Sequence, residues 1–215
     1  MTTHRSRVRR AALAIALAAA SVVLAACGGD EDEASGTPSN TAGRSASQAV
    51  DDAHNAQDVQ FAQGMIPHHR QAVDMADLAP GRAASKEVKD LAEQIKKAQD
   101  PEITTMSGWL TSWGEEVPQD PADAGGEGSH GMDHSGHDSM PGMMSDKEMG
   151  ELEKLSGEAF DAAFLRMMVE HHEGAVDMAT TERSEGAYQP AKDLAKAIVT
   201  AQTDEIAVMN DLLDG

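Results

Sequence analysis

The segment MIPHHRQAVDMA, residues 65–76, recurs 103 positions later as MVEHHEGAVDMA, residues 168–179. The same shift aligns residues 58–110 with residues 161–213 without a gap, and 22 of these 53 pairs are identical. Chance does not produce identity of this extent, so we interpret the two halves as a duplication. Each half carries a pair of adjacent histidines, in a chain that has only nine histidines.

Each half is expected to form two helices. In the second helix of each half, apolar residues recur every three or four positions, the period of an α-helix. They are Val88, Leu91, Ile95, Ile103, Met106 and Leu110 in the first half, and Leu194, Ile198, Ile206, Met209 and Leu213 in the second. Two duplicated helix pairs predict an all-α, four-helix bundle. Proline inside a helix removes a backbone donor, so we expect a kink or a restart at Pro67 and Pro101.

The N-terminus has the pattern of an export signal. Residues 1–26 contain four arginines followed by an apolar run that is short for a membrane span, and Leu24-Ala25-Ala26-Cys27 closes it. This ending resembles a lipobox, so we predict lipid on Cys27 and a protein held at the outer face of the cytoplasmic membrane. The alternative is an ordinary signal peptide with Cys27 there by chance. Residues 27–49 lack large apolar side chains and are predicted to be a flexible tether.

The mature chain is strongly acidic. Without the four arginines of residues 1–26 it has 13 basic and 37 acidic residues, a formal charge of −24. Nucleic acid is therefore an unfavourable partner and cations are suitable ones, although a solvated acidic surface explains most of these charges. Cys27 is the only cysteine, so a lipidated chain has no thiolate ligand. The sequence is compatible with a homo-oligomer and identifies no copper-delivery partner.

We divide residues 50–215, taken as one domain, into a first helical repeat (50–113), a loop (114–144) and a second helical repeat (145–215). Ser145 and Glu148 form a capping-box pattern that predicts a short helix after the loop. The loop combines histidine with methionine, a composition that indicates metal binding, or else a linker of biased composition. Its candidate ligands are His130, Met132, His134, His137, Met140, Met143 and Met144.

The repeated segments place imidazoles and thioethers on one face of each first helix, because residues three and four apart share a face. Imidazole suits copper and zinc, and thioether selects soft ions such as Cu(I) or Ag(I). The main candidate ligands are Met65, His68, His69 and Met75, with Met168, His171, His172 and Met178. Methionine at this spacing also serves as core filler, but a core does not need an adjacent His pair in both halves. Weaker candidates on the second helices are Glu102, Met106, Glu205 and Met209, which could instead orient the His rings or lie on the surface.

Both M-x-x-H-H-x-x-A-V-D-M-A copies and the downstream Q-x-x-E-I-x-x-M segments resemble the domain of unknown function 305 family. The resemblance covers about residues 50–215. It implies a ferritin-like four-helix fold, placement outside the cytoplasm and, for some members, copper binding through His and Met. Many members of this family have no assigned role.

The function favoured by these features is a lipid-anchored, non-enzymatic protein that sequesters or passes on copper, with Cu(I) preferred. One alternative is a ferritin-like redox enzyme, but its di-metal centre needs Glu-x-x-His helices, and neither repeat has that motif. Another is a structural or partner-binding lipoprotein, which leaves the duplicated His pairs unexplained. We expect the two halves to share one metal cluster on the bundle axis.

Overall fold

A computed structural model describes residues 53–119 and 140–215 of the chain. These residues form five helices: α2 (Ala56–Arg82), α3 (Lys86–Trp113), α4 (Asp146–Leu152), α5 (Glu158–Glu185) and α6 (Gln189–Asp214). They contain no strand, and their only β-type pairing is an isolated bridge between Ala83 and Gly157. The expected all-α bundle is therefore confirmed. Cys27 and the loop residues His130, Met132, His134 and His137 lie outside the described ranges.

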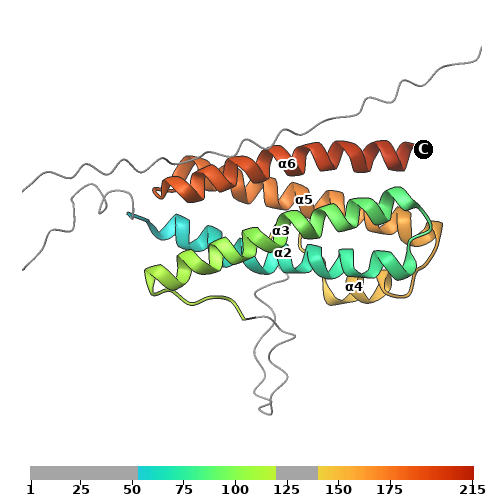
Figure 1. Cartoon of the computed structure of the whole chain (residues 1–215), viewed down its shortest axis with the longest axis horizontal. Helices are drawn as coiled ribbons and strands as arrows, with labels where there is room; N and C mark the ends of the chain where they lie inside the picture. The colour runs from blue at the N-terminus through green and yellow to red at the C-terminus, as the bar shows by residue number, and fades with distance from the viewer. Residues whose placement is uncertain (1–52, 120–139) are drawn as a thin grey trace, which may run out of the picture. The chain divides into compact units, whose positions relative to one another are not determined.

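Four long helices build the bundle, and all of them belong to one compact unit (Figure 1). Helix α2 packs on α3 and α5 packs on α6, so each half is a helix pair. The two pairs meet mainly through α2 and α5, the helices that carry the His pairs, and the short α4 contacts α5. No helix in the described part of the chain is both long and apolar enough to cross a membrane.

The helix ends follow from local sequence. Asn55 and Asp58 form a capping box at the start of α2, and Ser145 and Glu148 form the one predicted for α4. Helix α2 continues through Pro67, and α3 continues through Pro101. Neither proline restarts its helix, so that part of the expectation is wrong. Tertiary packing of these long helices outweighs the single backbone bond that each proline removes.

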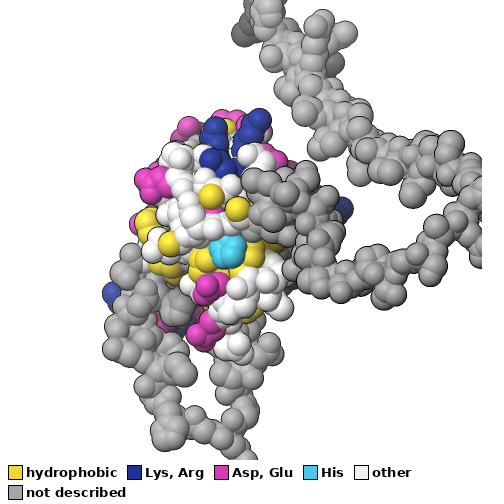
Figure 2. Space-filling view, turned by 90° about the vertical axis from the view of Figure 1, so that its left-hand side faces the viewer, with side chains coloured by type: hydrophobic (Ala, Val, Ile, Leu, Met, Phe, Trp, Pro, Cys, Tyr) yellow, Lys and Arg dark blue, Asp and Glu magenta, His cyan; other side chains and the backbone are white. Residues whose placement is uncertain are grey.

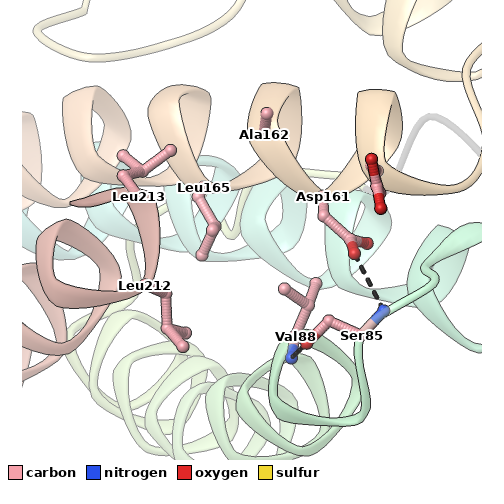
Figure 3. A pocket seen from close by; sticks show the side chains of 8 residues that line it. Ser85, Val88, Asp161, Ala162, Leu165, Leu212 and Leu213 are labelled. Atoms are coloured by element: carbon pink, nitrogen blue, oxygen red, sulfur yellow. Dashed lines mark hydrogen bonds between the residues drawn. The ribbon is translucent and has the colours of Figure 1, made fainter. Parts of the chain in front are cut away.

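Two aspartates at equivalent positions tie the halves together crosswise. Asp58 on α2 accepts hydrogen bonds from the backbone N–H groups of Ala187 and Tyr188, in the turn between α5 and α6. Asp161 on α5 accepts from Ala84 and Ser85, in the turn between α2 and α3. Figure 3 shows the bond between Asp161 and Ser85 at the edge of a small surface pocket. Each half therefore satisfies the exposed backbone donors of the other.

The hydrophobic core is interrupted at its middle. Along α2, one apolar cluster contains Phe61 to Ile66 and another contains Ala72 to Ala83, with His68 and His69 between them. Along α5 the order of the clusters is reversed, again with the His pair between them. Gln99 on α3 and Gln202 on α6 are buried at the corresponding level. A polar layer therefore crosses the bundle between two apolar halves of the core.

An aromatic group closes the end of the bundle where α2 begins and α3 ends. His54 stacks on Trp113 with a distance of 4.3 Å between ring centroids. Tyr188 meets Trp109 and Trp113 edge to face, at 5.6 Å and 5.2 Å. Figure 2 shows this end, with a histidine surrounded by hydrophobic side chains. This packing covers the apolar core at the end where the chain enters the bundle.

Candidate metal centre

The four histidines of the repeats lie together in the polar layer. His68 and His69 project from α2, His171 and His172 project from α5, and each is at most 1% exposed. The rings of His68 and His171, one from each half, have their centroids 3.8 Å apart and are tilted by 41°. The centroids of His171 and His172 are 6.3 Å apart. The duplicated pairs thus meet as one cluster at the interface between the halves.

One histidine of each pair is held by a glutamate from the neighbouring helix. His69 Nε2 lies 2.7 Å from Glu102 Oε2, and His172 Nε2 lies 2.7 Å from Glu205 Oε2. An ionised carboxylate only accepts hydrogen bonds, so each Nε2 carries a proton and donates it. The lone pair of the neutral ring is then on Nδ1, which has no hydrogen-bond partner in either residue. These contacts place Glu102 and Glu205 beside the His rings, where each carboxylate can fix the orientation of one ring.

The other two histidines differ in their partners. His68 Nε2 lies 3.1 Å from the carbonyl oxygen of Pro141, which can only accept, so the lone pair of His68 is also on Nδ1. Neither ring nitrogen of His171 has a hydrogen-bond partner. In total, five buried ring nitrogens of the four histidines are unpaired. Buried polar atoms normally have partners, so this concentration fits a cluster built to bind a ligand.

Burial also keeps the two central rings neutral. Removal from water, aided by the neighbouring His69, lowers the pKa of His68 to about 3. Burial lowers the pKa of His171 well below its ordinary value, and His68 and His172 add to this effect. A metal ion binds the neutral form of imidazole. His68 and His171 therefore stay in the neutral form that a metal requires at pH values well below the ordinary pKa of histidine.

The candidate methionines lie on both sides of the layer. Met65 and Met106 are buried in the cluster that contains Phe61, whereas Met75, Met168, Met209 and the loop residue Met144 are buried in the other. Met178 is only partly buried, although its counterpart Met75 is fully buried. Met140 and Met143 are also partly buried. In residues 53–119 and 140–215, no three His, Cys, Asp or Glu side chains group as a metal ion would require.

Residues 140–144 form a strap across the centre. Gly142 has a φ of +75°, and a Cβ there would lie 2.6 Å from the Glu170 carbonyl oxygen. A Cβ on Gly174 would lie 2.0 Å from the Pro141 carbonyl oxygen. The strap therefore crosses α5 at a point where both segments have a glycine. Gln71 fixes the other end, because its side chain bonds both the N–H and the carbonyl of Met144. The strap thereby brings the Pro141 carbonyl to His68.

No motif in the sequence predicted this strap. Its two anchors, Gln71 and Gly174, occupy equivalent positions in the two halves, but they are not identical. A buried acid at the end of the bundle, Glu182, was also missed, and its counterpart is Ala79. Both features involve positions at which the two repeats differ. The predictions relied on positions at which the repeats are identical, so they did not include these residues.

Comparisons with known proteins agree with this fold. Residues 58–213 match the family described as Domain of unknown function (DUF305). A DUF305 protein from Streptomyces coelicolor is 34% identical with a TM-score of 0.63, covering 74% of this chain and 91% of that chain. A DUF305 fragment from Deinococcus radiodurans is 33% identical with a TM-score of 0.61, covering 74% and 97%. CopM in its Cu(II)-bound form is 31% identical with a TM-score of 0.58, covering 73% and 95%.

CopM structures in Cu(I)-bound and Ag-bound forms also match this chain, at 28% and 29% identity. No match was found among curated proteins.

Proposed function

This chain belongs to the DUF305 family, and we propose that it binds a soft metal ion, Cu(I) by preference, at the histidine layer of its bundle. The observation that carries the proposal is the set of five unpaired, buried ring nitrogens on His68, His69, His171 and His172. Leaving so many polar atoms without partners is costly in a folded protein. Each neutral ring has one lone pair to give, so a bound cation that accepts these lone pairs lowers that cost.

The donor set supports a soft ion. Imidazole binds several transition metals, but thioether sulfur adds affinity only for soft ones. Methionines stand on both sides of the layer, with Met65 in one apolar cluster and Met168 in the other. The similar protein CopM has been solved with Cu(I), Cu(II) and Ag bound. We assign His68 and His171 as the central ligands, with His69, His172 and the flanking thioethers of Met65, Met75 and Met168 as the remaining donors.

Within this site, Glu102 and Glu205 act on the metal through the histidines. Each carboxylate holds the Nε2 of one ring and so directs the Nδ1 of that ring as the ligand atom. The Pro141 carbonyl gives His68 the same tautomer. Copper supplied here is cargo, and the role we propose is sequestration or transfer outside the cytoplasm, with the chain anchored through lipid on Cys27.

The test is a Cu(I) competition titration of the mature chain against a chromophoric chelator. In a background with His130, Met132, His134 and His137 replaced by serine, we expect His68→Gln combined with His171→Gln to abolish tight Cu(I) binding. Two central ligands are lost, and amide groups are poor donors to Cu(I). His54→Gln is the matched control, because His54 stacks on Trp113 at the end of the bundle.

Circular dichroism would verify that each variant keeps its helices. Undiminished Cu(I) affinity in the folded His68→Gln and His171→Gln double variant would refute the proposal, since the unpaired nitrogens would then have no role in binding. A loss of affinity in His54→Gln as well would indicate a global effect and would equally count against the assignment.

A further inference from the structure

A surface hollow lies over Gly64, one turn before His68 on α2. It has a volume of about 310 Å³ and lies between α2, α5 and the strap. A Cβ on Gly64 would stand 3.0 Å from the terminal methyl of Met178 and 3.7 Å from the sulfur of Met140. The missing side chain of Gly64 therefore leaves room in which two methionines, 38 positions apart in sequence, approach the same point.

Met140 is positioned by the anchored strap. The strap is fixed by Gln71 at Met144 and by the close contact of Gly142 with α5. The N–H of Met143 also donates to the carbonyl of Met140 at 3.2 Å, which closes a turn. Met140 precedes Pro141, whose carbonyl holds His68. Its thioether consequently stands next to the part of the strap that covers the histidine layer.

The chemistry of the hollow is selective. Its lining consists of Gln57, Gln60, Phe61, Gly64, Met140, Pro141, Met178 and Thr181, without a charged side chain. Hard cations such as Ca²⁺ and Mg²⁺ prefer carboxylate oxygens, whereas thioethers bind soft ions. The other half has no equivalent arrangement, because the counterpart of Gly64 is Met167 and the counterpart of Met178 is the fully buried Met75.

We propose that Met140 and Met178 are the thioether ligands of a second site for a soft monovalent cation, Cu(I) or Ag(I), separate from the histidine layer. The site stands on its own geometry. The further idea that an ion binds at this site before it passes to His68 rests on the proposed function. Thioethers do not titrate, so the ion is held there without competition from protons.

The test uses the full mature chain labelled with ¹³C at its methionine methyl groups and titrated with Ag(I), which is not readily oxidised. Met140→Leu and Met178→Leu assign the two signals, since leucine is similar in size and has no donor atom. We expect both signals to move together, and each substitution to remove the response of the other methionine and about one bound Ag(I) per chain. Met149→Leu, a partly buried methionine of α4, is the control that leaves both responses unchanged.

Two results would overturn the proposal. One is a Met178 signal that still responds fully in Met140→Leu, which would mean that the two sulfurs do not share an ion. The other is the loss of both responses in the His68→Gln and His171→Gln double variant, which would place them in the histidine centre. Should that double variant and the wild type bind Cu(I) equally, the proposed function fails, but the paired methionine response still decides the second site.

Discussion

The two halves of the bundle carry the same candidate ligand residues in different surroundings. His68 and His171 occupy equivalent positions, yet His68 is bonded to the strap and His171 has no partner at either nitrogen. The cause lies one turn away, where Gln71 bonds the strap and Gly174 lets it approach. The two halves therefore carry equal side chains at these positions, and a few differences between the halves determine which side of the cluster is covered.

The ends of the halves differ in the same way. Asp58 and Asp161 make equivalent crosswise caps, but Asp58 also lies beside a fully buried acid, Glu182. Burial raises the pKa of Glu182 to about 8, and the Asp58 carboxylate beside it contributes. Burial alone would raise the pKa of Asp58 too, but the Glu182 carboxyl and three backbone N–H groups outweigh that effect and lower it. Asp58 is thus ionised and Glu182 protonated at neutral pH.

The largest effect is expected from removing the crosswise caps. Asp58→Ala leaves the backbone N–H groups of Asn55, Ala187 and Tyr188 without their acceptor, whereas Asp161→Ala affects those of Ala84 and Ser85. At about 1 kcal/mol per lost bond, the free energy of unfolding should fall by about 3 kcal/mol for Asp58→Ala and about 2 kcal/mol for Asp161→Ala. Urea denaturation at pH 6 measures both. If Asp161→Ala lowered the free energy of unfolding more than Asp58→Ala, the number of hydrogen bonds would not explain the relative contributions of the two caps.

A smaller, pH-dependent effect should come from Glu182. Its pKa is about 8 in the folded protein and near 4.5 in the unfolded chain, so the folded state holds the extra proton between these values. The contribution of Glu182 to stability is therefore complete below pH 4.5 and is lost as the pH rises to about 8. Glu182→Gln should remove this loss, so its stability relative to wild type should rise between pH 5 and pH 8.5 by at most about 1.4 kcal/mol per pH unit.

The matched control for this comparison is Glu185→Gln, because Glu185 is exposed on the same helix. Thermal unfolding followed across the pH range gives the difference between each variant and wild type, which cancels the contribution of the histidines. Parallel curves for Glu182→Gln and wild type would contradict the assignment of a protonated Glu182.

The smallest change in stability is expected at the strap. Gly174→Ala should displace it, because the new Cβ would meet the Pro141 carbonyl at 2.0 Å, while alanine favours the helix by about 1 kcal/mol. The net change should therefore be about 1 kcal/mol or less, but hydrogen exchange at the Met144 amide should accelerate. Gly108→Ala on α3 meets no atom within 4 Å, so it should stabilise the helix and leave that exchange unchanged. If hydrogen exchange at the Met144 amide were unchanged in Gly174→Ala, the contact with Gly174 would not be what holds the strap in place.

Much of the fold could be predicted because helices and their starts depend on residues that are close together in the sequence. Apolar residues at helical spacing predicted the four long helices, and Ser145 with Glu148 predicted the start of α4. The placement of Glu102 and Glu205 beside the histidines was one of three interpretations left open by the sequence, and the structure puts both carboxylates there. The restart expected at Pro67 and Pro101 was wrong because the cost of one missing donor is local, whereas the packing that offsets it is not.

The sequence by itself determined the helices and the residue types that each half places on one helix face, since these follow from residue identity and spacing within a few turns. Only the tertiary structure decided that His68 meets His171, that Nδ1 is the free atom of three rings, and that Asp58 caps the opposite half. These contacts join residues 33 to 130 positions apart. A helical period does not encode contacts over such sequence separations. They are set by how the two helix pairs pack and by where the strap crosses them.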